Sequence, residues 1–285
     1  MNRTITLQIN HEYDNLKIHS VLSRLGFSSA IIKSLKDYPD SVLLNSSSAK
    51  IIDRVFYGDV LSVTVSEPAS DITPVNLPLD IIYEDEDIVA VNKPRNMPTH
   101  PSFEHTTDTL ANALMYYYNA NLTFHPITRI DKDTSGVVLV AKNMLSAHIL
   151  TESIKTKQIQ KQYIAVVNGT PFPLEGTISA PIEKSDGIRR TVSPIGKDAV
   201  SKYSTIKSIG NLSLVSLIPI TGRTHQLRVH LAHLGTPIYG DWLYNPNPSD
   251  GILRLHCHAV TFNHPITKET ISITTPCPDD MNILN

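Results

Sequence analysis

Residues 128–142, TRIDKDTSGVVLVAK, place charged side chains next to a turn and an apolar run. Asp131 follows Arg129 by two positions, and the turn at residues 133–136 leads into the apolar residues 137–141. A charged turn before a short β-branched run is typical of a loop that enters a buried strand. Asp131 is therefore expected beside the core, where a carboxylate is costly to desolvate unless it is paired or used in chemistry. The alternative is a turn-forming Asp that caps backbone N–H groups.

The composition is that of an ordinary globular protein. The chain has 285 residues, of which 41% are hydrophobic and 18% charged, enough for one large domain or two unequal ones. Its two cysteines, Cys257 and Cys277, make neither a disulfide framework nor a four-ligand metal site. We find no signal peptide and no apolar stretch of membrane-spanning length, and we expect a soluble, cytoplasmic protein with no membrane partner. A net charge of −2 argues against binding to nucleic acid by electrostatics alone, although an RNA enzyme needs only a local basic surface.

The first 70 residues differ in pattern from the rest. Apolar residues at helical spacing predict a helix over residues 16–25, and Ser28 or Ser29 fits the N-cap of a second helix. Residues 42–44 and 60–63 are expected to form short strands. Two helices followed by strands resemble the small RNA-binding fold first named for a ribosomal small-subunit protein, here called S-four-like. The alternative is a small cap that contributes only to packing or solubility.

From residue 79 to residue 285 we expect a second, catalytic domain, joined to the first by a proline-containing, semi-rigid linker that ends near residue 78. Residues 81–92 read as a β-hairpin. Helices are expected over residues 109–118, 146–155 and 224–234, and further strands over residues 137–141, 161–169, 176–182, 201–206, 213–220 and 271–274. Because strands outnumber helices and βαβ alternation is rare, we predict an α+β fold with a mainly antiparallel mixed sheet beside a small α/β N-terminal domain.

Four stretches of the chain occur in the order found in one enzyme family. They are VNKPRNMPTHPS (91–102), TRIDKDTSGVVLVAK (128–142), KQYIAVVNG (161–169) and TGRTHQLRVHLAHLGTPIYGD (221–241). The second stretch resembles the H-R-L-D-x-x-T-S-G signature of the RluA/RluD-type pseudouridine synthases, with Thr128 where that family often has His. The resemblance spans most of residues 80–260. It implies an enzyme that isomerises uridine in RNA and requires no metal, nucleotide or redox cofactor.

The same resemblance assigns roles to five residues. Asp131 would be the catalytic carboxylate, either as a nucleophile at the sugar or as the base that removes a sugar proton. Arg223 would pair with Asp131 and keep it ionised, although an Arg after a glycine turn could also cap the preceding strand. Arg129 would fill the space left by the flipped base, or alternatively contact a phosphate. Tyr163 would stack on the uracil and could take the carbon proton, where a core aromatic is the alternative; Leu255 would form part of the pocket wall.

Histidines raise the question of a metal site. The clustered residues are His225, His230, His233, His256 and His258, the last two flanking Cys257. Zinc uses such ligands, but neither H-E-x-x-H nor C-x-x-C is present and no acidic ligand has a suitable spacing. We therefore expect no metal and interpret these histidines as packing and phosphate-contacting residues.

The favoured hypothesis is a monomeric RNA pseudouridine synthase acting on large-subunit ribosomal RNA, because S-four-like domains most often accompany such enzymes. A tRNA pseudouridine synthase is the alternative within the class. Two hypotheses come from other classes: a non-catalytic RNA-binding assembly factor, which would tolerate Asp131→Ala, and a metal-dependent hydrolase, which would hold stoichiometric zinc.

Overall fold

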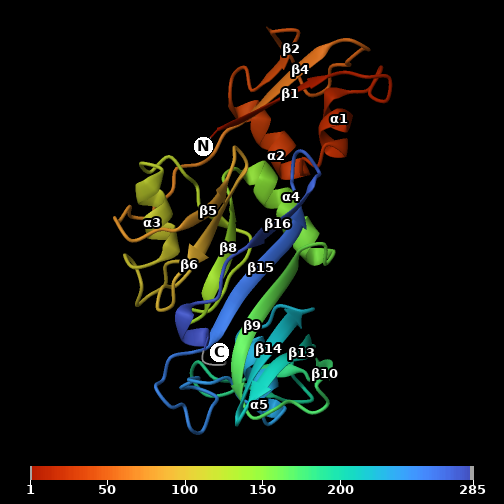
Figure 1. Cartoon of the computed structure of the whole chain (residues 1–285). Coiled ribbons are helices and arrows are strands. Elements are labelled where there is room, and N and C mark those ends of the chain that lie inside the picture. Colours follow the sequence, from red (N-terminus) through yellow and green to blue (C-terminus); the bar gives the residue numbers. More distant parts are fainter. Residues whose placement is uncertain (1, 283–285) are drawn as a thin grey trace.

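The computed structural model describes residues 2–282, which form one small sheet, one large sheet and a two-stranded hairpin. The small sheet contains residues near the N-terminus and lies at one end of the elongated molecule (Figure 1). The large sheet runs from there to the opposite end. None of the helices in this described range is both long and apolar enough to cross a membrane.

The small sheet has the order β1-β4-β2-β3. Its strands are β1 (Arg3–Gln8), β2 (Val42–Leu44), β3 (Ser47–Ser48) and β4 (Val60–Val65). The helices α1 (Ile18–Arg24) and α2 (Ser29–Ser34), the latter continued by the 3-10 turn η1 (Leu35–Asp37), cover one face. Ser28 accepts a hydrogen bond from the Ile31 backbone at 3.2 Å, which confirms the predicted N-cap of the second helix.

This N-terminal module is fixed to the large sheet by apolar and ionic contacts. Leu145 of helix α4 (Met144–Lys155) is fully buried in the apolar cluster of the module. The Arg3 Nε donates to Asp87 at 3.0 Å, and Asp87 also accepts hydrogen bonds from Asn143 and Ser146. Burial raises the pKa of Asp87, but these donors outweigh it and the pKa is lowered. The two parts of the chain are therefore joined by a partly buried ion pair and by apolar packing.

The predicted linker lies along the surface of the large sheet's domain. Residues 68–78 contain no helix or strand. Ile72 and Leu77 nevertheless pack against the main apolar core, and Asn112 donates to the Thr73 carbonyl at 2.8 Å. These contacts hold the segment in place along its length.

The large sheet has the order β10-β13-β14-β9-β15-β8-β6-β5, with β16 paired to β15 and β7 paired to β8. Its strands are β5 (Ile81–Glu84), β6 (Ile88–Lys93), β7 (His125–Pro126), β8 (Ser135–Ala141), β9 (Gln160–Asn168), β10 (Glu175–Ser179), β13 (Val200–Ile209), β14 (Leu212–Pro219), β15 (Leu255–Asn263) and β16 (Thr270–Thr274). Every pairing is antiparallel except that of β15 with β8. The predicted α+β class with a mainly antiparallel mixed sheet is thus confirmed.

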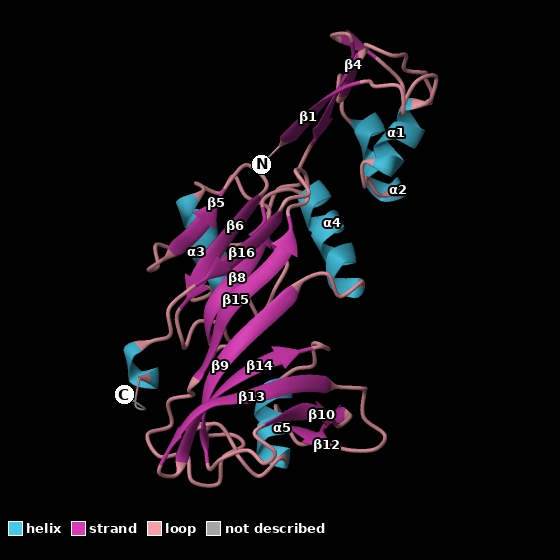
Figure 2. Cartoon of the chain, turned by 45° about the vertical axis from the view of Figure 1, so that its right-hand side comes forward, coloured by secondary structure: helices cyan, strands magenta, loops and turns pink. Residues whose placement is uncertain are grey.

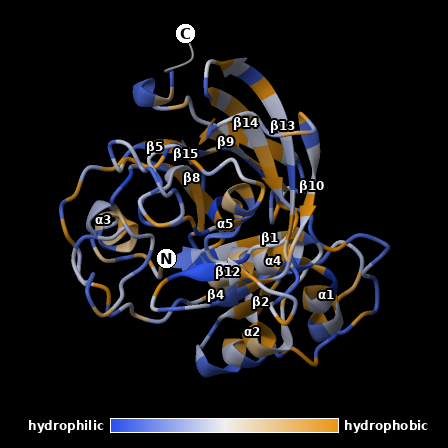
Figure 3. Ribbon diagram, turned by 90° about the horizontal axis from the view of Figure 1, so that it is seen from below, coloured by the Kyte–Doolittle hydropathy of each residue, from blue (hydrophilic) through white to orange (hydrophobic). Residues whose placement is uncertain are grey.

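Helices flank this sheet at positions close to those predicted. They are α3 (Leu110–Tyr117), α4 and α5 (Gln226–His233); η2 (Asp279–Met281) is a short 3-10 turn near the C-terminus. The hairpin of β11 (Ile182–Lys184) and β12 (Arg190–Val192) stands beside α5 (Figure 2). Strands β13 and β14 contain both hydrophobic and hydrophilic residues (Figure 3), and burial alternates along residues 212–217 of β14, as expected for a strand with one buried face.

Strand β8, which contains the apolar run predicted from the sequence, lies in the interior of the sheet. Residues 137–141 in β8 are all fully buried, because β8 lies between β6 and β15 and is covered on both faces. Gly136, at the start of β8, has φ +112°, and an added Cβ would lie 2.2 Å from the Cys257 carbonyl oxygen of β15. Only glycine allows the two backbones to approach this closely. This approach fixes where the loop carrying Asp131 meets the sheet.

Candidate active site

All five residues singled out from the sequence line one cavity of about 530 Å³. Asp131 and Arg129 come from the loop before β8, Tyr163 from β9 and Leu255 from β15, while Arg223 precedes α5. The cavity therefore lies where β8, β9 and β15 meet the N-terminal end of α5. Residues from four stretches that are far apart in sequence converge on it.

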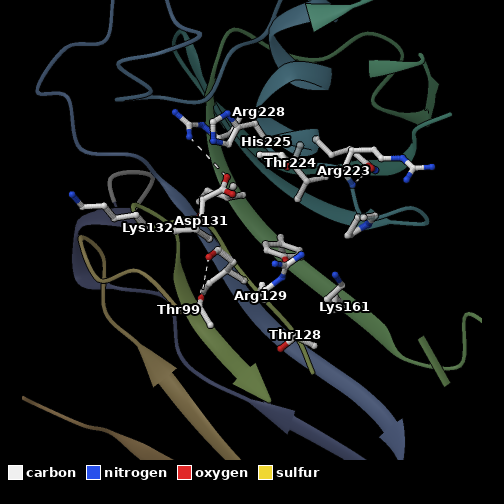
Figure 4. Close-up of a pocket in the computed structure, with 18 of the residues that line it drawn as sticks. Thr99, Thr128, Arg129, Asp131, Lys132, Lys161, Arg223, Thr224, His225 and Arg228 are labelled. Carbon is white, nitrogen blue, oxygen red and sulfur yellow. Dashed lines mark hydrogen bonds and ion pairs between the residues drawn. The ribbon is translucent and has the colours of Figure 1, made fainter. Parts of the chain in front are cut away.

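The carboxylate of Asp131 faces Arg228 of α5. Asp131 Oδ2 lies 3.9 Å from Arg228 Nη1, and the Asp131 side chain is 29% exposed (Figure 4). Arg228 is itself buried and donates two hydrogen bonds to Asp241, from Nε at 2.8 Å and from Nη2 at 2.7 Å. Burial lowers the pKa of Arg228, but Asp241 and Asp131 outweigh this effect and raise it. Arg228 is thus a permanently charged group held rigidly by Asp241, with one nitrogen left over for Asp131.

The predicted ion pair between Arg223 and Asp131 is wrong. Arg223 Nε donates to the Asp198 carbonyl at 2.9 Å, and its side chain extends away from Asp131 (Figure 4). The cause is the backbone at the start of α5, where His225 has φ +56°. After this left-handed residue the helix begins, so Arg228 is turned toward the cavity while Arg223 stays at its rim. Arg228 was a visible candidate in the sequence, because it lies with Arg223 in the family-like stretch 221–241. That stretch ends at Asp241, the residue that binds Arg228.

A buried lysine supports the loop that carries Asp131. Lys93, at the end of β6, is completely buried, and its amine donates to the carbonyls of Pro94, Met97 and Lys132 at 2.8, 2.7 and 3.1 Å. Burial lowers the pKa of Lys93 to about 7, and the negative charge of Asp131 opposes that shift. No role was predicted for Lys93, which lies in the stretch 91–102, because its carbonyl partner at residue 132 is far away in the sequence.

Tyr163 and Leu255 form the inner wall of the cavity. Both are buried, with 6% and 3% of their surface exposed, and both belong to the main apolar core. Burial raises the pKa of the Tyr163 hydroxyl well above its usual value, and Cys257 and Asp131 raise it further. The phenol is therefore neutral, and it presents an apolar ring beside Asp131 instead of a basic phenolate. Both alternatives considered for Tyr163, a core aromatic and a pocket residue, describe its position.

Three further basic residues line the cavity, namely Arg129, Lys132 and Lys161. Arg129 is exposed, and none of the hydrogen bonds or ion pairs found within residues 2–282 involves its side chain. Lys161, two residues before Tyr163, also lines the cavity, and burial lowers the pKa of its amine. Lys161 is the first residue of the family-like stretch 161–169, but no role was predicted for it from the sequence. Thr128, at the position where the family often has His, has a structural task, since its hydroxyl accepts from the Leu139 backbone at 2.8 Å.

The histidines of α5 are used in packing. His230 is fully buried, with Nδ1 2.9 Å from the Ser201 hydroxyl and Nε2 3.0 Å from the Ala180 carbonyl. His225 Nδ1 lies 2.8 Å from the Tyr244 hydroxyl, and burial lowers the pKa of His225. The structure therefore supports the interpretation as a polar packing group for His230, whereas His225 also lines the cavity.

Comparison with known proteins identifies the family. Residues 87–233 match the family model described as RNA pseudouridylate synthase. The chain is 39% identical to "Uncharacterized RNA pseudouridine synthase YlyB" of Bacillus subtilis, over 84% of this chain and 83% of that protein. It is 36% identical to "Ribosomal large subunit pseudouridine synthase D" of Xylella fastidiosa, over 84% and 78% of the two chains.

A solved structure agrees with these sequence matches. "Human RNA Pseudouridylate Synthase Domain Containing 4" superposes with a TM-score of 0.60 at 28% identity, covering 71% of this chain and 90% of that one. The family model includes Asp131, Tyr163, Arg223 and Arg228, whereas Leu255 lies beyond its last matched residue. The chain belongs to the RNA pseudouridylate synthase family and is an isomerase that acts on RNA.

Proposed function

We propose that this enzyme converts uridine to pseudouridine in large-subunit ribosomal RNA with Asp131 as the catalytic carboxylate. The observation that supports Asp131 most strongly is its position in the cavity, since its carboxylate faces the buried, doubly bonded guanidinium of Arg228. The reaction breaks the bond between the sugar and N1 of the uracil and rejoins the base through C5. It then moves the C5 proton away and places a proton on N1.

Asp131 acts on the sugar in this proposal, either by attacking it or by removing a sugar proton. Both routes need an ionised, oriented carboxylate next to a base that has left its stack. Arg228 supplies the orientation, and Lys93 holds the backbone of the same loop through the Lys132 carbonyl. The nucleophile and base routes share this geometry.

The rest of the cavity accommodates the flipped base. Tyr163 stacks on the uracil as a neutral ring, and Leu255 forms part of the same inner wall of the pocket. Arg129 has a long, planar cation without a polar partner in the described chain, and it occupies the space that the base leaves in the RNA. Arg223, at the rim, contacts a phosphate next to the flipped nucleotide.

Two observations support ribosomal RNA as the substrate. A relative covering 84% of this chain carries the name "Ribosomal large subunit pseudouridine synthase D". The N-terminal module has two helices and a small sheet, consistent with the S-four-like domain expected for residues 1–70, and it is held firmly against the catalytic part. We propose that it binds structured RNA next to the target, that the enzyme works as a monomer, and that it acts in the cytoplasm.

The test is a pseudouridine map of total RNA from cells that contain or lack the gene. Loss of one or a few sites in large-subunit ribosomal RNA, restored by the wild type and not by Asp131→Ala, is expected. Asp131→Asn, which keeps the size of the side chain, should also fail to restore them. Lost sites in tRNA would transfer the proposal to tRNA. Unchanged maps, or full rescue by Asp131→Ala, would favour an RNA-binding assembly factor.

A further inference from the structure

Three potential metal ligands meet on the face of β15 that points away from the cavity. They are His256 and His258 of β15 and Cys277, which follows β16; one ligand atom of each lies within 4.8 Å of the others. His256 is aligned with Ile164 of β9, and Ile164 belongs to a small apolar cluster that also contacts Cys277. Leu255 and Cys257, the residues on either side of His256, belong to the main core beside Tyr163.

Each of the two imidazoles uses Nδ1 for a contact with a neighbouring oxygen. His258 Nδ1 lies 2.7 Å from the Thr275 carbonyl, which can only accept, so Nδ1 carries the proton and Nε2 holds a free lone pair. His256 Nδ1 lies 2.9 Å from the Ser135 hydroxyl, and its Nε2 is buried without a hydrogen-bond partner. Metal-bound histidines commonly use one ring nitrogen for a carbonyl or hydroxyl and the other for the metal.

A buried, unpartnered nitrogen needs an explanation. His256 is 1% exposed, and leaving a polar atom unpaired at such a position costs free energy comparable to a lost hydrogen bond. A metal ion bound at Nε2 would satisfy this atom. Cys277 and His258 are only partly buried, so an ion can reach the cluster from solvent.

The charges nearby allow a divalent cation. The positive charge of Arg95 acts on His256 and would also repel a metal ion bound there. Arg95 is paired with Asp280 at 2.6 Å, and its charge is thereby compensated. Cys277 would lose its thiol proton to solvent on binding and add one negative charge at the ion.

A second cluster of possible ligands serves as a contrast. Asp85, Asp87 and His264 also lie within 4.8 Å of one another. Asp87 is already bonded to Arg3, and His264 Nε2 lies 3.1 Å from Asp85. These atoms have hydrogen-bond partners, whereas Nε2 of His256 forms no hydrogen bond of good geometry within residues 2–282, although the Thr275 carbonyl lies near this imidazole.

We propose that His256, His258 and Cys277 form a zinc site that fastens the C-terminal segment to the back of β15. Two imidazoles and a thiolate are a donor set that zinc favours, with water completing a tetrahedron. The segment after Cys277 contains Met281, which packs on the same apolar cluster as Ile164. The ion would join this segment to the strand that carries Leu255 on its opposite face. It has a structural role and takes no part in the isomerisation.

The test uses the purified full-length chain under reducing conditions, stripped of metal and titrated with zinc against a chromophoric chelator. One zinc per chain is expected. His258→Gln and Cys277→Ser should each weaken binding by about a hundredfold or more. His19→Gln, which changes an exposed histidine of α1, is the matched control and should change the affinity less than about twofold. Circular dichroism verifies that each variant is folded.

Cobalt gives a second readout that does not depend on activity. Cobalt-loaded wild type should show thiolate-to-cobalt charge-transfer absorption, and Cys277→Ser should lack it while His19→Gln retains it. The proposal is overturned if the wild type binds no zinc at micromolar concentration. It is equally overturned if zinc binds with unchanged affinity in both ligand variants. In that case Nε2 of His256 would carry a proton and donate it to the Thr275 carbonyl, and the three residues would pack together without a metal ion.

Discussion

Arg228→Lys is the substitution that most directly probes how the site orients Asp131. A lysine keeps the positive charge but cannot form the two bonds at 2.8 and 2.7 Å to Asp241 while also facing Asp131. At 3.9 Å and an effective dielectric constant of about 20, the attraction between Arg228 and Asp131 has an upper bound of about 4 kcal/mol. Because Asp131 is 29% exposed, solvent screening reduces this to about 1–2 kcal/mol.

Loss of that attraction, together with a misplaced carboxylate, should lower the rate about 10- to 100-fold. The assay is release of tritium from uridine labelled at C5 in a ribosomal RNA fragment, measured under single-turnover conditions. The affinity for the RNA should change less than about threefold, since Arg228 is buried behind Asp131. Thermal melting is needed alongside, because Asp241 is fully buried and keeps only part of its pairing in the variant.

Arg223→Lys is the matched control, because it makes the same chemical change at the rim of the same cavity. Arg223 is bonded to the Asp198 carbonyl, and its charge survives the substitution. We expect a single-turnover rate within about threefold of the wild type. If Arg223→Lys lost as much activity as Arg228→Lys or more, the pairing of Asp131 with Arg228 would be refuted as the basis of its orientation.

Three further predictions concern the fold and the pH dependence. Gly136→Ala should destabilise the protein by more than about 3 kcal/mol in urea unfolding, because the new Cβ would lie 2.2 Å from the backbone of β15; Gly58→Ala, with φ +89° but open space, should cost only about 1–2 kcal/mol. The ratio of single-turnover rates for wild type and Tyr163→Phe should stay constant from pH 7 to 9, because the raised pKa of Tyr163 keeps the phenol protonated; a ratio that climbs tenfold per pH unit would identify a phenolate base. Arg3→Met should cost about 1–3 kcal/mol at pH 7. Since the pKa of Asp87 is lowered in the folded state, that difference should shrink in denaturation curves as the pH falls below 3.8, and a constant difference would contradict the ion pair.

Much of the architecture could be predicted because it follows from local patterns. The apolar run at residues 137–141 is a central strand, and the helix predicted over residues 146–155 is α4, which begins two residues earlier. Asn143 explains the difference, since its side chain accepts from the Ser146 backbone at 2.8 Å and caps the helix. A cap of this kind is visible in the sequence, but the choice among neighbouring polar residues depends on the tertiary contact that Asn143 also makes with Asp87.

The partner of Asp131 could not be predicted with the same certainty. Arg223 and Arg228 are chemically identical and lie in one stretch, five positions apart. Their different roles follow from the left-handed conformation of His225 and from Asp241, which captures Arg228 inside the fold. Neither the backbone angle nor the long-range partner can be read from spacing. The same holds for Lys93, whose three carbonyl partners come from residues 94, 97 and 132.

The distribution of charge resolves an apparent conflict in the sequence. A chain with a net charge of −2 must bind a polyanion and bring a carboxylate to it, and both steps are opposed by like-charge repulsion. The cavity contains two kinds of cation, one that pairs with the carboxylate and one that is free to contact RNA. Arg228 is buried and bonded to Asp241, so it serves Asp131 and remains in place when RNA leaves. Arg129 lies at the surface without a polar partner in the described chain, so it is available to the RNA. Removing the charge of Arg129 should therefore weaken RNA binding and its salt dependence, while removing that of Arg228 should slow the reaction of RNA already bound.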